Sequence, residues 1–124
     1  MIIAVDFDGT CVTHEYPEIG KSIGAEDVLR ELIEEGHQLI LWTMRSGDGL
    51  VEAVEWFEEN ELELFGINEN PEQNWSDSPK AYADLYIDDL SLGAPLKANM
   101  LSEKPYINWV RVRKNLVANH ILRP

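Results

Sequence analysis

The chain opens with Met1-Ile2-Ile3-Ala4-Val5-Asp6-Phe7-Asp8-Gly9-Thr10, which is the most informative segment of the sequence. Five apolar residues lead directly into two aspartates spaced two positions apart. A short unbroken apolar run is typical of a strand buried on both faces, as in a parallel sheet. Side chains at i and i+2 leave a strand on the same side, so Asp6 and Asp8 can share one metal ion or divide nucleophile and acid duties. Burying two carboxylates is costly unless a cation or a reaction occupies the site.

The remaining sequence alternates between strand-like and helix-like segments. Apolar patterning predicts further strands at residues 38–43, 64–67 and 83–87, a short edge strand at 105–107, and helices near 25–35, 49–60 and 108–120. Strands that alternate with helices of this length favour a parallel sheet with helices on both faces. The expected fold is therefore α/β: a single three-layer Rossmann-like domain over residues 1–124 with a mainly parallel sheet.

Composition excludes several classes of function. The net charge of −13 disfavours a nucleic acid or an anionic membrane as partner. No apolar run is long enough to span a bilayer, and the first apolar run lacks the basic flank of a signal peptide, so we expect a cytoplasmic protein. The single cysteine, Cys11, excludes an intramolecular disulfide. Residues 97–124 hold six of the ten basic residues. We expect the helix predicted near 108–120, within this segment, to pair with acidic helices of its own domain.

Acidic and hydroxyl side chains follow the predicted strands where each strand ends. These residues are Asp6, Asp8, Thr43, Asp88 and Asp89. Ligands of open parallel sheets bind beyond the carboxyl ends of the strands, so we expect these side chains to converge. Carboxylates brought together need a cation, and oxygen ligands suit Mg²⁺, which in proteins usually acts on phosphates.

Groups suited to a phosphate lie near the same strand ends. Thr43 offers a hydroxyl, and the backbone N–H groups that follow it, from Met44 onward, open a turn leading into a helix. Arg45 and Lys80 are the cations nearest the predicted strand ends, and either could neutralise phosphate oxygens. An aspartate nucleophile could carry the phosphoryl group covalently and so divide a difficult hydrolysis into two easier steps.

These motifs resemble those of the haloacid dehalogenase (HAD) superfamily of phosphatases. Asp6-Phe7-Asp8-Gly9-Thr10 resembles its first motif, Thr43 its second, Lys80 its third and Asp88-Asp89 its fourth, in the family's order. The resemblance covers residues 1–93. It implies a phosphomonoester hydrolase in which Asp6 is the nucleophile and Asp8 is the general acid and base. Thr43 and Lys80 would then bind the phosphoryl group, with Met44 and Arg45 beside them as further substrate-binding residues.

The resemblance also implies a Mg²⁺ ion. Its ligands would be the Asp6 carboxylate, the Asp8 backbone carbonyl, and one of Asp88 and Asp89, with the choice between the last two left open. The family often inserts a cap domain, but residues 11–24 and 68–79 are too few to hold one. The expected protein is a capless member whose site is open, with the flap at 11–21 or the loop at 68–79 as candidates to cover the substrate.

Several alternatives remain at this point. A small phosphorylated metabolite is the preferred substrate, and a polynucleotide end-phosphatase is disfavoured by the net charge. A phospho-receiver signalling domain needs its acceptor aspartate after the third strand, where Ile67-Asn68 stands instead. A non-catalytic metal-binding or scaffold protein is the third alternative. An open site and exposed aromatic residues make a homo-oligomer a reasonable expectation.

Overall fold

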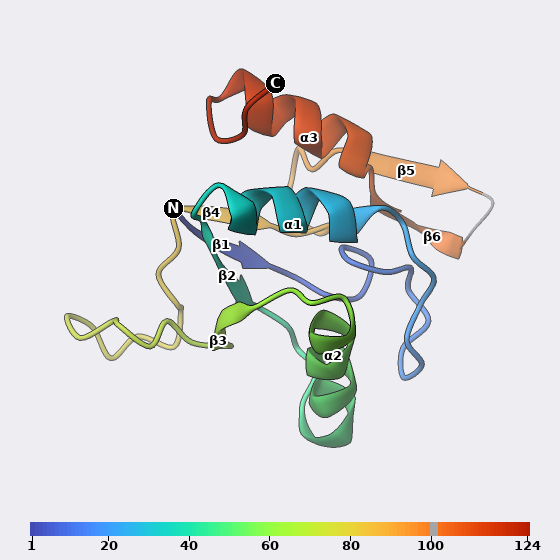
Figure 1. Ribbon diagram of the computed structural model, residues 1–124. Coiled ribbons are helices and arrows are strands. Elements are labelled where there is room, and N and C mark those ends of the chain that lie inside the picture. Colours follow the sequence, from blue (N-terminus) through green and yellow to red (C-terminus); the bar gives the residue numbers. More distant parts are fainter. Residues whose placement is uncertain (100–101) are drawn as a thin grey trace.

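The fold is a small α/β domain built on a four-stranded parallel sheet (Figure 1), as given by a computed structural model that describes residues 1–99 and 102–124. The sheet has the order β3-β2-β1-β4, with every neighbouring pair parallel. Its strands are β1 (Ile2–Val5), β2 (Gln38–Leu41), β3 (Leu64–Ile67) and β4 (Leu85–Ile87). The helices are α1 (Ala25–Glu34), α2 (Gly47–Glu59) and α3 (Trp109–Ala118). The predicted α/β class with a mainly parallel, helix-flanked sheet is confirmed.

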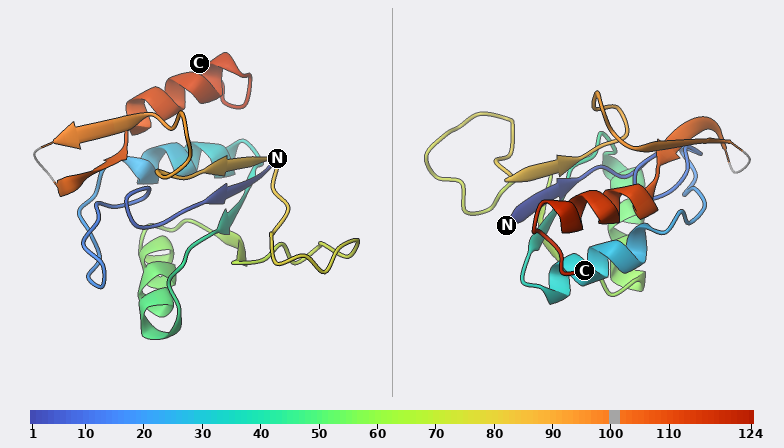
Figure 2. Two further views of the ribbon diagram at one scale, coloured as in Figure 1. Left: turned by 180° about the vertical axis from the view of Figure 1, so that it is seen from behind. Right: turned by 90° about the horizontal axis from the view of Figure 1, so that it is seen from above.

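One face of the sheet carries the main core. The register pairs Ile3 with Leu39 and Val5 with Leu41, so these fully buried side chains point to the same side. The core cluster that contains them also holds buried residues of all three helices, among them Leu29, Phe57 and Trp109. The helices therefore pack on this face, as the view from above shows (Figure 2).

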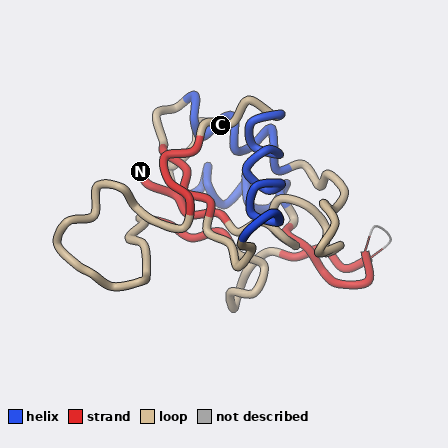
Figure 3. The backbone as a smooth tube through the Cα atoms, turned by 90° about the horizontal axis from the view of Figure 1, so that it is seen from below, coloured by secondary structure: helices blue, strands red, loops and turns tan. Residues whose placement is uncertain are grey.

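The other face of the sheet differs from expectation. A smaller cluster lies here, with Ala4, Ile40 and Ala83 buried and Trp42 and Tyr86 packed against them. Among the described residues no helix contributes to this cluster, and the loop 68–84 contributes Ala83 near its end. The rest of this loop projects from the body of the molecule (Figure 3). This loop is polar, is rich in turn-forming residues and lacks an apolar repeat with helical spacing. It therefore cannot form an amphipathic helix that would pack on the sheet.

The predicted elements agree with the structure except at the C-terminal hairpin. The expected edge strand at 105–107 is the end of a longer strand, β6 (Ser102–Ile107), which pairs antiparallel with β5 (Leu96–Asn99). β5 escaped prediction because its sequence Leu-Lys-Ala-Asn has too weak an apolar pattern. Asn108 is the N-cap of α3, since its side chain accepts a hydrogen bond of 3.2 Å from the Arg111 N–H.

The basic C-terminal segment pairs with acidic residues near α1, as expected. Arg113 forms a two-pronged ion pair with Glu31, with both N–O distances at 2.8 Å. Arg123 lies 3.8 Å from Glu35. Both pairs are on the surface and contribute little to stability, and the first of them links α3 to α1. Within the described part of the chain, no helix has the length and apolar character needed to cross a membrane.

Candidate active site

Three aspartates meet at the carboxyl edge of the sheet. Asp6 follows β1, while Asp88 and Asp89 follow the neighbouring strand β4; the Asp6 N–H donates to the Ile87 carbonyl at 3.0 Å, which continues the pairing past the strand ends. Each aspartate offers one carboxylate oxygen, and the three oxygens lie within 4.8 Å of one another. The predicted convergence of these residues is confirmed, and the cluster is a candidate metal-binding site.

The Asp6 carboxyl is strongly perturbed. The pKa of Asp6 is raised from 3.8 to about 8, chiefly by burial and then by the neighbouring Asp88 and Asp89, while the hydrogen bond from Thr10 acts in the opposite direction. Without a cation, the folded protein therefore holds a proton on Asp6 at neutral pH. A bound cation would offset both the burial and the repulsion, so the electrostatics of the cluster fit a metal ion.

Hydrogen bonds of Thr10 connect Asp6 with Asp89, a role that the sequence analysis did not predict. Its side chain is fully buried, and its hydroxyl donates to Asp6 at 2.8 Å and lies 3.3 Å from an Asp89 oxygen. The same hydroxyl oxygen accepts from the Asp89 N–H at 3.1 Å. The Thr10 carbonyl accepts from the Trp109 indole at 2.7 Å, so α3 supports the cluster from behind. The signal in the sequence was the position of Thr10 directly after Asp-Gly.

His14, within the expected flap at 11–21, also contacts the cluster. Its Nε2 lies 2.7 Å from Asp89, whose side chain is 4% exposed. Gly9 makes this approach feasible: its φ is +81°, and a Cβ there would overlap the His14 ring and an Asp89 oxygen. Asp89 is thus enclosed by Thr10 and His14, whereas Asp88 is half-buried and lines a hollow beside the cluster.

A hollow of about 320 Å³ opens beside the cluster. It is lined by Asp6, Trp42, Thr43, Met44, Asn68 and Asp88. The Thr43 N–H donates to the Asn68 side chain at 2.8 Å, and the Thr43 hydroxyl oxygen accepts from the Arg45 N–H at 3.1 Å. These bonds fix Thr43 at the rim, and since its O–H donates to no group among residues 1–99 and 102–124, it can donate to a ligand. Met44, predicted as a substrate-binding residue, lines the hollow and is fully exposed.

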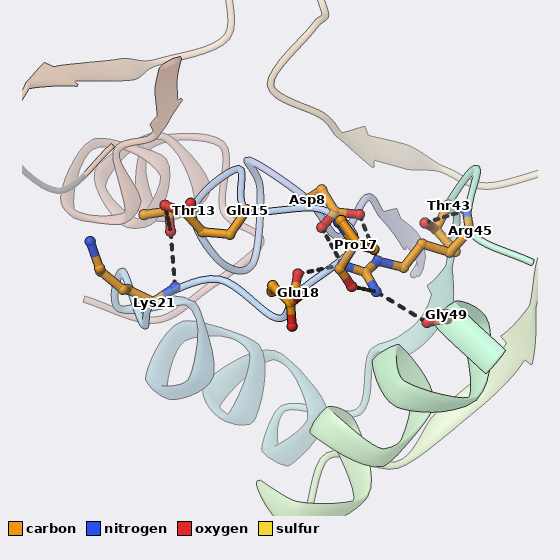
Figure 4. A network of polar contacts seen from close by, with 9 residues as sticks. All are labelled: Asp8, Thr13, Glu15, Pro17, Glu18, Lys21, Thr43, Arg45 and Gly49. Carbon is orange, nitrogen blue, oxygen red and sulfur yellow. Dashed lines mark hydrogen bonds and ion pairs between the residues drawn. The ribbon is translucent and has the colours of Figure 1, made fainter. Parts of the chain in front are cut away.

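Asp8 and Arg45 form a separate pair beside the cluster (Figure 4). The Arg45 guanidinium donates a hydrogen bond to each Asp8 oxygen, at 2.8 and 2.7 Å, and its remaining N–H groups donate to backbone carbonyls. The Arg45 side chain is 2% exposed. No N–H of Arg45 is left for a substrate, which disagrees with the expected role of Arg45 in binding phosphate. The Asp8 carboxylate does not belong to the three-aspartate cluster.

Lys80 is not brought to the hollow either. It lies in the exposed loop 68–84, and its ammonium nitrogen is 5.1 Å from the centre of the Tyr86 ring, on the second face of the sheet. Trp75, in the same loop, packs edge-on against Tyr82, with ring centres 5.7 Å apart. Lys80 stands where the order of the motifs predicts a phosphate-binding lysine. The path of the loop, however, keeps it from lining the hollow.

The fold and the acidic edge together define an α/β domain with a candidate metal site at the carboxyl ends of β1 and β4. The chain is similar to a solved structure of a conserved protein from Bacteroides thetaiotaomicron, with 38% identity and a TM-score of 0.77. The alignment covers 97% of this chain and 91% of that one. The chain belongs to the same family as this conserved Bacteroides protein. No protein-family model and no curated protein matches the chain.

Proposed function

We propose that the protein is a Mg²⁺-dependent phosphatase of the HAD type that hydrolyses a phosphate monoester. The observation that carries the proposal is the convergence of Asp6, Asp88 and Asp89 beside a hollow that Thr43 also lines. Carboxylates from two adjacent strands supply the charge that a cation needs, and the Thr43 hydroxyl offers a donor to a phosphoryl oxygen. The sequence motifs at these positions resemble those of HAD phosphatases and support the same conclusion.

The donor set fits Mg²⁺. Its side-chain ligands are carboxylate oxygens, which hard divalent cations prefer. Asp6 and Asp88 both line the hollow and would hold the ion directly, whereas Asp89 is enclosed by Thr10 and His14 and would act from behind. When bound, the ion would neutralise phosphate oxygens and keep Asp6 ionised.

The protein's own residues then divide the chemistry. An Asp6 oxygen attacks phosphorus, the bond from phosphorus to the ester oxygen breaks, and that oxygen takes the proton of a neutral Asp8 carboxyl group. For Asp8 to carry that proton, one of its two oxygens has to leave the Arg45 guanidinium. Water next attacks phosphorus, gives a proton to Asp8, and releases phosphate as Asp6 regains its carboxylate. Thr43 holds the phosphoryl group during both steps. Neither Arg45 nor Lys80 serves as a phosphate ligand in this scheme, because neither lines the hollow.

The preferred substrate is a small phosphorylated metabolite in the cytoplasm. The net charge of −13 opposes a polyanion such as an oligonucleotide. Neither the loop 6–24 nor the loop 68–84 holds a further domain, so the hollow is open to solvent on the side of Met44. A second subunit or the substrate itself would have to cover it.

Hydrolysis of a panel of phosphate esters with and without Mg²⁺ tests the proposal. We expect Mg²⁺-dependent phosphate release that falls at least a thousandfold in Asp6→Asn, because the nucleophile is lost. Asp77→Asn removes an exposed loop carboxylate and is the matched control, with unchanged rates expected. Turnover by Asp6→Asn at the wild-type rate would refute the mechanism, and a lack of turnover by the wild type on every ester class would refute the function.

A further inference from the structure

Arg45 is the most extensively bonded side chain beside the site. A guanidinium has five N–H donors, and all five are used here. Two grip the Asp8 carboxylate at 2.8 and 2.7 Å, and one donates to the Glu18 carbonyl at 2.9 Å. The other two reach the carbonyls of Pro17 and Gly49, each at 3.3 Å. Figure 4 shows these partners around one planar group.

The same guanidinium packs against two rings. Its central carbon lies 5.1 Å from the centre of Phe7 and 5.0 Å from that of Tyr16. Phe7 is fully buried and stands between the two motif aspartates, whereas Tyr16 belongs to the flap, defined as residues 11–21, and is 65% exposed. Arg45 thus joins the end of β1, the flap and the first turn of α2.

We propose that Arg45 is a positioning residue that fixes the orientation of Asp8 and couples it to the flap. Both Asp8 oxygens are engaged by one buried cation, and that cation is held in turn by the flap carbonyls of Pro17 and Glu18. A flap movement that breaks the carbonyl bonds therefore loosens the hold on Asp8. The catalytic part of this inference rests on the proposed phosphatase function, whereas the coupling between flap and Asp8 does not.

Hydrogen exchange tests the coupling without reference to activity. Within the flap, the Thr13 N–H donates to the Lys21 carbonyl at 3.1 Å, and the Lys21 N–H donates to the Thr13 hydroxyl at 2.9 Å. We expect these amides to exchange at least about tenfold faster in both Arg45→Gln and Asp8→Asn than in the wild type. Unchanged exchange in either variant would overturn the coupling.

A matched control is available at the surface contact between α3 and α1. Arg113→Gln breaks an arginine–carboxylate fork of the same geometry, to Glu31 at 2.8 and 2.8 Å, but on the surface and away from the flap. Its flap amides should exchange as in the wild type. Arg45→Lys keeps the charge and loses the fork, so it serves in place of Arg45→Gln if melting curves show that the glutamine variant is unfolded.

Kinetics test the positioning of Asp8. An alkyl phosphate needs the leaving-group proton far more than an aryl phosphate with a good leaving group. We expect Arg45→Gln to lower kcat about tenfold more for the alkyl ester, with KM changed less than threefold, and to add little further loss in an Asp8→Asn background. An equal loss of kcat on both esters would show that Arg45 only supports the structure. A raised KM with unchanged kcat would show that Arg45 binds the substrate. Either result would overturn the proposal that Arg45 positions Asp8. If the wild type hydrolyses neither ester, the phosphatase proposal fails, and the exchange result alone decides the coupling.

Discussion

Replacing Asp6 by Asn is expected to stabilise the metal-free protein, although it should abolish activity. Asp6 sits in the three-aspartate cluster, where burial first, and then Asp88 and Asp89, raise its pKa from 3.8 to about 8. In the unfolded chain the same carboxyl ionises near its ordinary value. Asn is neutral at every pH and keeps an oxygen to accept the hydrogen bond that Thr10 now donates to Asp6 at 2.8 Å.

The size of the effect follows from the shift in pKa. A raised pKa in the folded state means that stability is lost as the pH rises from 3.8 through about 8. At about 1.4 kcal/mol per pH unit above 3.8, the loss that Asn removes is about 2 kcal/mol at pH 5 and about 4 kcal/mol at pH 7. The gain on substitution should therefore grow with pH.

Urea unfolding of the two proteins in EDTA at pH 5 and pH 7 measures this gain. Asp77→Asn, which removes an exposed carboxylate from the loop 68–84, should show almost no change at either pH. A gain for Asp6→Asn that is equal at both pH values, or a loss of stability at pH 7, would refute the electrostatic account of the cluster.

Four further outcomes are expected. Mg²⁺ should stabilise the protein against unfolding by about 2.7 kcal/mol at 100 times its dissociation constant. Calorimetry should also show its affinity rising up to about tenfold per pH unit from pH 6 to 8, since binding displaces the Asp6 proton; pH-independent binding would contradict this. Gly9→Ala should cost about 1–3 kcal/mol in urea unfolding, because φ is +81° and the methyl group would overlap His14; a neutral effect would contradict the packing. Trp109→Phe should cost about 1–3 kcal/mol by leaving the buried Thr10 carbonyl without its donor, and wild-type stability would show that bond to be unimportant.

The sequence predicted those parts of the site that depend on strand order alone. Asp6, Thr43, Asp88 and Asp89 each stand at or just beyond the end of a strand, and parallel strands deliver their ends to one edge of the sheet. Reading the apolar runs was enough to place these four residues together. The side-chain roles of Thr43 and the aspartates remain predictions that activity measurements will test.

Residues whose direction depends on a loop were harder to predict. Arg45 carries a charge suited to phosphate, but the flap folds back and its carbonyls engage the guanidinium together with Asp8. The same fold-back brings His14 to Asp89. Lys80 depends on the path of the loop 68–84, which has no periodic apolar pattern from which its course could be inferred.

Trapping a phosphoryl group on Asp6 tests the central claim most directly. The wild type should be mixed with Mg²⁺ and the best ester from the panel, quenched in acid during turnover, and its N-terminal peptide examined by mass spectrometry. The account predicts one phosphoryl group on Asp6 in the wild type and none in Asp6→Asn. Phosphate release with no label on Asp6, or a label on another residue, would contradict it.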